Sequence, residues 1–219
     1  MFVTFRLAGS VPKPVLQEWK AEKEWLEEEL LRVAREARET ETIEAINHEA
    51  RLIAFQRRWF LRFEKVLHRG DHGPTWLKDE RIAKLVADSI RHRDGKVYRL
   101  DAYCIMSNHV HVVFKPFLDE RSLSVKDNAE KLSFENEDPP LSAIMHSLKS
   151  YTANEANKVL KRSGPFWEAE SYDHVIRDKQ EYHCVVAYVL NNPVKAGLVR
   201  DWRDWQWTWR RVRQAASLS

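Results

Sequence analysis

The sequence predicts an α+β fold in which helices pack on an antiparallel sheet. Short runs rich in β-branched residues lie near the N-terminus, in the middle of the chain and near residue 175. Segments with apolar residues at helical spacing separate these runs. The resulting order is strand, helix, strand, strand, helix, strand, helix. That order is typical of an α+β sandwich built on an antiparallel sheet.

The first part of the chain contains one predicted strand and a charged helical hairpin. Residues 2–7 alternate as a strand does. Apolar residues at helical spacing from Val15 to about Arg38, and again over residues 43–60, predict two helices. We therefore expect residues 14–68 to form a helical hairpin inserted after the first strand. A solvated surface role is favoured for it, and an arm that binds a partner or holds DNA is the alternative.

The middle of the chain predicts a helix and two paired strands. A loop rich in Gly, Asp and His at residues 68–74 precedes a helix over residues 79–91. A turn at Asp94-Gly95 leads into a second strand, which runs from Val97 to about Cys104. The third strand follows a bend at Ser107-Asn108 and carries two histidines.

The rest of the chain predicts a loop, two helices and a tail within a single domain over residues 1–219. Residues 116–140 contain few apolar side chains and end in two prolines, which indicates a long, mobile acidic loop. A helix is expected from Leu141 to Leu160. The last 20 or so residues, 200–219, form a basic tail rich in Trp.

The last predicted helix follows a short strand that ends at residues 174–177. It runs from Glu181 to Leu190, and Asp178 is placed to cap its N-terminus. Pro193 is expected to stop it, because the residue before a proline is disfavoured in helical conformation.

Composition indicates a soluble globular protein with a charged surface. Hydrophobic residues make up 43% of the chain, charged residues 32%, and the formal net charge is +3. No apolar run approaches the roughly 20 residues of a membrane helix. The apolar run at the N-terminus is too short and too interrupted to be the core of a signal peptide. We therefore expect a cytoplasmic protein. Cys104 and Cys184 lie in apolar runs and are expected to be buried, reduced thiols.

Two histidines on the third strand are the most informative feature of the sequence. Side chains at i and i+2 of a strand share a face, so His109 and His111 stand side by side. Val110 and Val112 then point the other way, into a core. Two imidazoles on one face make half of a metal site. A structural role for the histidines is the alternative, and a metal ion needs a third donor.

The end of the last helix offers that donor and a nucleophile. Tyr188 and Asn192 are four residues apart, so their side chains share a helix face. The amide oxygen of Asn192 can complete a metal site, and the phenol of Tyr188 can be the reacting group. Tyr151 is the second candidate nucleophile, whereas packing roles are expected for Tyr172 and Tyr182.

Together these motifs resemble the single-tyrosine HUH transposases, and most closely the REP-associated tyrosine transposases. The resemblance covers most of the chain outside the helical insert and the acidic loop, and the ordered set of motifs is specific. The stretches that carry it are Val3–Leu7, Trp76-Leu77, Met106–His111, Phe166-Trp167, Val175–Asp178 and Tyr188–Val199.

The resemblance implies a ferredoxin-like or RRM-like sheet and a DNA-processing enzyme. The implied reaction is cleavage and joining of single-stranded DNA beside palindromic hairpins, with Tyr188 as catalytic nucleophile and a 5′-phosphotyrosine intermediate. His109, His111 and Asn192 would hold a divalent metal ion, Mg²⁺ or Mn²⁺. The partners implied are hairpins of single-stranded DNA, for a monomer or homodimer in the bacterial cytoplasm or nucleoid.

Several side chains are candidates for gripping the DNA, although each could instead be a solvated charge or a packed ring. Trp167 could stack on an unpaired base, with core packing as the alternative. The candidate phosphate contacts are Lys115, Lys149, Lys161, Arg162, Arg177 and Lys195. Two other functions stay open: a non-catalytic hairpin-binding module on an RRM-like sheet, and a metal-dependent phosphodiesterase that forms no covalent intermediate.

Overall fold

A computed structural model describes the protein at residues 1–38, 58–117 and 140–212. These residues fall into two compact units. The sheet unit comprises Met1–Ala8 and Thr75–Ser219, and the hairpin unit comprises Gly9–Pro74. Most of the predicted acidic loop, much of the second helix of the insert and the end of the tail lie outside the described residues.

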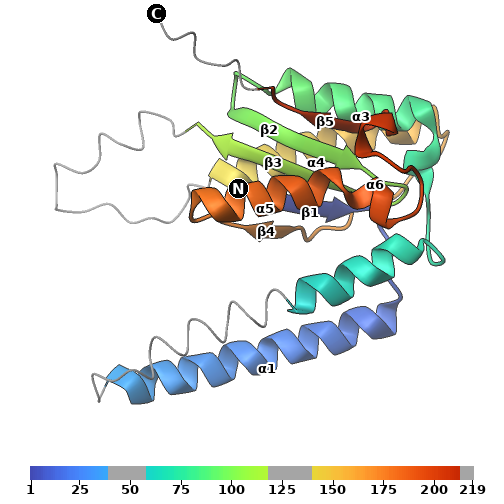
Figure 1. Cartoon of the computed structure of the whole chain (residues 1–219). Coiled ribbons are helices and arrows are strands. Elements are labelled where there is room, and N and C mark those ends of the chain that lie inside the picture. Colours follow the sequence, from blue (N-terminus) through green and yellow to red (C-terminus); the bar gives the residue numbers. More distant parts are fainter. Residues whose placement is uncertain (39–57, 118–139, 213–219) are drawn as a thin grey trace, which may run out of the picture. The chain divides into compact units, whose positions relative to one another are not determined.

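The sheet unit contains a five-stranded antiparallel sheet (Figure 1). Its strands lie in the order β4-β1-β3-β2-β5, so β1, β3 and β2 are internal. The element order β-α-β-β-α-β through β4 is that of a ferredoxin-like unit. The predicted α+β fold with an antiparallel sheet is thus confirmed. The strands are β1 (Phe2–Arg6), β2 (Tyr98–Ile105), β3 (His109–Pro116), β4 (Tyr172–His174) and β5 (Thr208–Arg210).

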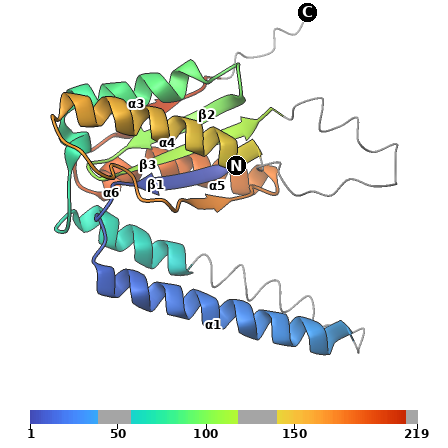
Figure 2. The same cartoon turned by 180° about the vertical axis from the view of Figure 1, so that it is seen from behind.

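Helices cover both faces of this sheet. Helices α3 and α4 lie on one face, as the view from behind shows (Figure 2). Helix α5 lies on the other face and packs on β2 and β3 (Figure 1). The bounds are α3 (Glu80–His92), α4 (Pro140–Val159), α5 (Lys179–Leu190) and a short α6 (Asn192–Lys195), with single 3-10 turns at Trp76–Lys78 and Trp202–Asp204. In the part of the chain that is described, no helix has both the length and the apolar character needed to cross a membrane.

Successive side chains of β3 point to opposite faces of the sheet. Val110 and Val112 are almost fully buried and belong to the main apolar cluster, which includes Ile82 of α3 and Ile144 of α4. The intervening histidines therefore point to the α5 face, as the alternation predicts.

The N-terminus of α5 is capped by side chains, which fixes where the helix begins. Asp178 Oδ1 accepts a hydrogen bond from the backbone N–H of Glu181 at 2.8 Å, so the predicted cap is confirmed. Glu181 in turn accepts from the backbone N–H of Arg177 at 2.7 Å and pairs with His174 Nε2 at 2.7 Å. These bonds anchor the start of α5 to β4.

The hairpin unit has a small aromatic core of its own. Its described helical segments are α1 (Lys13–Arg38) and residues 58–69. The ring centroid of Trp19 lies 5.5 Å from that of Phe63, and Trp59 stacks on Phe63 at 5.3 Å. His68 and Arg69 belong to the helix, so the loop expected from residue 68 begins at Gly70.

The two ends of the hairpin unit approach each other at a pair of glycines. Gly73 has a positive φ of 75°, and a Cβ at this position would overlap the carbonyl oxygen of Gly9. Only glycine allows the two backbone segments to pass this closely.

The tail adds a strand that the sequence pattern does not predict. Residues Thr208–Arg210 form β5, which pairs with β2 through Ala102, Tyr103 and Cys104. Trp209 stacks on Tyr103 with ring centroids 6.0 Å apart. The expectation that both cysteines are buried is also corrected: Cys104 is buried, but Cys184 lies on the exposed side of α5.

Candidate active site

The two histidines lie on the internal strand β3. Their ring centroids are 4.7 Å apart, and one nitrogen of each ring lies within 4.8 Å of a nitrogen of the other. His111 is paired with Thr4 on β1 and with Cys104 on β2. A strand held on both sides gives the two imidazoles a rigid base.

Each imidazole is oriented by a hydrogen bond at its Nδ1 atom. His109 Nδ1 lies 2.7 Å from Asn108 Oδ1, and His111 Nδ1 lies 2.8 Å from Thr4 Oγ1. An amide oxygen can only accept, so His109 Nδ1 is the donor and Nε2 carries the lone pair. Thr4 can accept in the same way. Such outer bonds are typical of metal-binding histidines, and the pair therefore fits a divalent cation.

Tyr188 reaches this pair from α5. Its ring centroid lies 5.7 Å from that of His111 and 5.9 Å from that of Phe2, which stacks on His111 at 5.9 Å. The ring is half-buried. The structure thus brings Tyr188 and His111, predicted from distant parts of the sequence, into one cluster.

Asn192 lies just beyond α5. It is the first residue of α6, so the expectation that Tyr188 and Asn192 share one helix is corrected. The buried Asn192 Nδ2 donates to Tyr188 O at 3.0 Å and to Val189 O at 3.4 Å. Because the amide nitrogen faces this backbone, the oxygen is the atom of Asn192 that could bind a cation.

Lys195 adds a positive charge beside Tyr188. Its ammonium nitrogen lies 4.3 Å from the centroid of the Tyr188 ring. Among the seven predicted DNA contacts, Lys195 is the one that the structure describes against Tyr188. An ammonium group here could contact a phosphate that approaches the phenol.

The other tyrosines fit the site less well. Burial, together with the nearby carboxylates of Asp173 and Glu181, raises the pKa of Tyr172 to about 12. Such a phenol is a poor nucleophile at neutral pH. Tyr151 lies on α4, which covers the opposite face of the sheet, and its side chain is 51% exposed. Tyr182 lies on α5, where its ring lies 5.7 Å from that of His183.

Lys149 and Trp167, two of the predicted DNA contacts, are hydrogen-bonded to neighbouring segments of the fold. Lys149 Nζ donates to Ala169 O at 2.7 Å and to Ser171 Oγ at 3.2 Å, and burial lowers its pKa to about 8. Trp167 is 7% exposed and donates its indole N–H to Thr152 Oγ1 at 2.9 Å. A ring enclosed in this way does not offer its face to a base, so packing is the better interpretation for Trp167.

The remaining predicted contacts lie apart from Tyr188. Lys115 is exposed near the end of β3, and Arg177 is exposed just before α5. Lys161 and Arg162 follow the C-terminus of α4. The sequence therefore identified surface cations, but only Lys195 is described next to the candidate site.

Three residues of the site were missed by sequence reasoning. Thr4 and Asn108 orient the imidazoles, and Phe2 packs against both His111 and Tyr188. The signal for Thr4 was present, since it is the polar residue between the apolar Val3 and Phe5. A polar side chain inside a buried strand calls for a partner.

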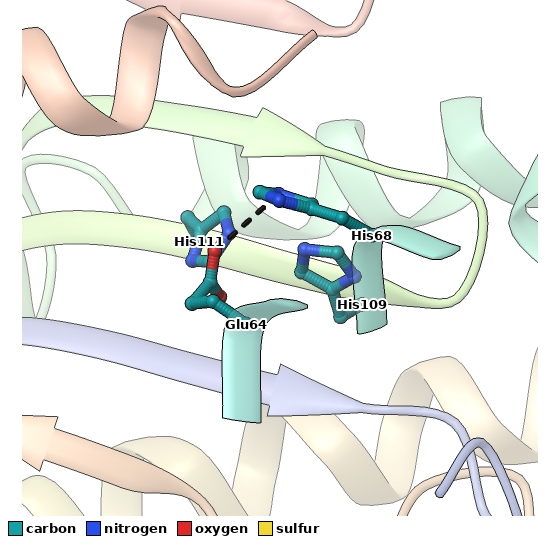
Figure 3. Close-up of side chains that lie close together, drawn as sticks. All are labelled: Glu64, His68, His109 and His111. Atoms are coloured by element: carbon teal, nitrogen blue, oxygen red, sulfur yellow. Dashed lines mark ion pairs between the residues drawn. The ribbon is translucent and has the colours of Figure 1, made fainter. Parts of the chain in front are cut away.

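The hairpin unit contains a second pair of side chains that can bind metal. Glu64 and His68 lie four residues apart on the helix over residues 58–69, and His68 Nε2 pairs with Glu64 Oε2 at 3.3 Å. Figure 3 draws this pair as well as His109 and His111 of β3. All four are residue types that could hold a metal ion. Neither Glu64 nor His68 was singled out from the sequence.

Comparisons with known proteins give a limited similarity. No family model matches the chain. An uncharacterized protein of Haemophilus influenzae is 27% identical over 101 residues, covering 44% of this chain and 54% of that protein. A second protein of that species, named "Putative REP-associated tyrosine transposase", is 23% identical over 107 residues, covering 49% of this chain and 56% of its own length.

The chain thus matches about half the length of each curated relative. A solved structure, described as a REP-associated tyrosine transposase bound to a REP hairpin, covers 62% of this chain and 67% of its own. Its identity is 18% and its TM-score 0.41. The similarity predicted from the motifs is confirmed: the chain resembles a protein named as a REP-associated tyrosine transposase.

Proposed function

We propose that this protein cleaves and rejoins single-stranded DNA at hairpin, REP-like sequences through a 5′-phosphotyrosine intermediate. The observation that carries the proposal is the cluster of Tyr188, His111 and His109, which joins a nucleophile to two oriented imidazoles. Similarity to a protein named as a REP-associated tyrosine transposase supports it. The enzyme class would be a tyrosine HUH transposase acting in DNA transposition and recombination.

In the proposed reaction, the Tyr188 oxygen attacks the phosphorus of the scissile phosphodiester. The phenol loses its proton, a bond forms between phosphorus and the Tyr188 oxygen, and the bond from phosphorus to the 3′ oxygen breaks. The 3′ oxygen takes up a proton and leaves as a free hydroxyl. Joining is the reverse step, in which a 3′-hydroxyl attacks the phosphotyrosine and releases the phenol. No ATP is needed, because the ester to Tyr188 retains the bond energy.

The other residues would hold and neutralise the reacting phosphate. A divalent cation held by His109, His111 and Asn192, Mg²⁺ or Mn²⁺, would polarise a non-bridging phosphate oxygen. The ammonium group of Lys195 would stabilise negative charge on the same phosphate. Thr4 and Asn108 would keep the lone pairs of the imidazoles directed at the cation.

A covalent-adduct assay tests the proposal. The protein is incubated with Mn²⁺ and labelled hairpins drawn from the DNA that flanks its gene, and the products are separated on a denaturing gel. The wild type is expected to form a protein–DNA adduct that Tyr188→Phe lacks. Tyr182→Phe, which removes a phenol from the same helix, is the matched control and is expected to retain the adduct.

The outcomes separate the alternatives. Hairpin binding without cleavage, unaffected by chelator, would indicate a non-catalytic nucleic-acid-binding module. Cleavage without an adduct would indicate a phosphodiesterase. An adduct that survives in Tyr188→Phe would assign the nucleophile to another tyrosine, and no adduct across varied hairpins would contradict the proposed reaction.

A further inference from the structure

A basic groove lies at the C-terminal end of α4, away from the candidate active site. Its volume is about 910 Å³, within the range of ligand-binding clefts. Helix α4 covers the sheet face opposite α5, as the two views show (Figures 1 and 2). We call this the α4 groove; its lining residues in the argument are Tyr151, Glu155, Lys158, Lys161 and Arg162.

The charge of the α4 groove is positive. Lys158, Lys161 and Arg162 face one acidic lining residue, Glu155. Lys158 Nζ pairs with Glu155 Oε1 at 2.7 Å, and both ends of this pair are solvent-exposed. Lys161 is exposed and forms no ion pair with any residue that the structure describes. The groove therefore suits an anionic ligand.

The turn that presents Lys161 is built in an uncommon conformation. Lys161 has a φ of 50°, and it is the one non-glycine residue with positive φ among the described residues. The backbone N–H of Arg162 donates to Asn157 O at 3.0 Å, and that of Lys161 to Lys158 O at 3.2 Å. Glycine usually occupies this position after a helix, because a side chain is disfavoured there. This turn fixes the backbone of Lys161 at the edge of the α4 groove.

Arg162 is fixed at the same turn. Its guanidinium donates to Asn157 Oδ1 at 2.5 Å and to Pro165 O at 3.2 Å. It also lies 4.0 Å from the centroid of the Trp76 ring. The cation is thus preorganised and costs little side-chain entropy when a ligand binds.

An exposed aromatic ring completes the groove. Tyr151 is 51% exposed, and Arg93 Cζ lies 6.0 Å from its ring centroid. Cations that alternate with an exposed aromatic ring are typical of surfaces that bind single-stranded nucleic acid. An exposed ring face favours a single strand over a duplex, since the bases of a duplex are already stacked on one another.

We propose that the α4 groove binds a segment of single-stranded DNA. Lys158 and Lys161 contact successive phosphates, and an unpaired base stacks on Tyr151. This inference rests on the proposed function and deepens it, because it assigns a second DNA surface on the face of the sheet that does not carry Tyr188. The groove then holds DNA that flanks the cleaved phosphodiester.

The first test removes the two lysine charges. Full-length Lys158→Gln/Lys161→Gln is compared with Lys84→Gln/Lys96→Gln, which removes two exposed lysines that do not line the groove. Binding of a labelled oligothymidylate of about 16 nucleotides is followed by fluorescence anisotropy. Between about 50 and 200 mM salt, we expect the slope of log K against log salt to fall by about 1.4 in the groove variant. The control is expected to match the wild type, and circular dichroism verifies folding.

The second test removes the stacking surface. Tyr151→Ala is expected to weaken binding of the same oligonucleotide by about tenfold, while Tyr151→Phe retains the affinity because the ring persists. Wild-type binding by folded Lys158→Gln/Lys161→Gln and Tyr151→Ala would overturn the inference and leave the proposed reaction intact. The opposite combination is also informative. If these variants bind more weakly while the wild type forms no covalent adduct, the result supports the α4 groove and contradicts the proposed reaction.

Discussion

The two faces of the sheet differ in what their side chains do: one forms the main apolar core and the other carries the candidate active site. On the face covered by α3 and α4, Val110 and Val112 pack in an apolar cluster. On the α5 face, His109 and His111 lie two residues apart on the same strand, beside Tyr188. The apolar face contributes stability to the sheet, and on the other face the paired strand β3 fixes the two imidazoles. Substitutions on the two faces should therefore change different quantities.

The largest effect is expected on the polar face. His109→Ala/His111→Ala removes both proposed nitrogen ligands, and adduct formation with Mn²⁺ should fall by roughly a thousandfold, the effect of losing several kcal/mol of charge stabilisation. The denaturing-gel assay measures it, with circular dichroism as the check on folding. Cleavage by the double variant that stays sensitive to chelator would contradict the role of these histidines.

A core substitution tests the apolar face. Ile82 of α3 is fully buried, so Ile82→Ala should lower the free energy of unfolding by about 2–5 kcal/mol through lost contacts and a cavity. Urea unfolding measures the change. The rate of adduct formation per folded molecule should stay at the wild-type value. A large fall in that rate would show that the two faces are not separable.

A smaller effect is expected where the outer hydrogen bond of His111 is lost. Thr4→Val keeps the shape of the side chain but removes the bond to His111 Nδ1. Affinity for Mn²⁺, measured by titration calorimetry, should fall by about 10- to 100-fold. Thr152→Val is the matched control, because Thr152 is buried and bonded to Trp167 on the other face. Equal losses of affinity in both variants would argue against a specific role for Thr4.

The smallest effect is expected on the pH dependence of stability, through Lys149 on α4. Burial lowers the pKa of Lys149 from its ordinary value of 10.5 to about 8. Between these values the unfolded chain binds more protons at this group than the folded protein, so wild-type stability should gain from Lys149 as pH rises. Lys149→Met lacks this gain. The free energy of unfolding is measured at pH 8 and pH 10 for both proteins. Its change between these two pH values should be less favourable in the variant than in the wild type. Equal changes would contradict the lowered pKa of Lys149.

The sequence pattern predicted those helices and strands whose own residues show a clear periodicity or a capping residue. The alternation around His109 and His111 predicted both the strand and its two faces, and Asp178 with Glu181 marked the start of α5. The strand β5 gave no such signal, because its three residues are held by pairing with β2 rather than by their own pattern. Its existence depends on a partner about a hundred residues away in the sequence.

The site shows the same limit. Thr4 meets His111 across β1 and β3, at a sequence separation of 107, and only the register of those strands brings them together. The expected end of the last helix at Leu190, before Pro193, is confirmed. Pro193 also lies in the first turn of α6, a position that proline favours because no N–H donor is needed there. The sequence predicted the end of one helix at this proline, but not the start of the next.

The close approach of Gly9 and Gly73 at the two ends of the hairpin unit has a consequence for changes in the length of the insert. Ala8 and Leu77 are bonded through their backbone N–H groups to Phe166 and Ser107, so both flanks of the insert are anchored within the sheet unit. A Cβ on Gly73 would meet the Gly9 backbone, so the two ends of the hairpin unit lie next to each other. Because the chain leaves and re-enters the sheet unit at neighbouring positions, a change in the length of the insert need not alter the pairing of β1 with β3.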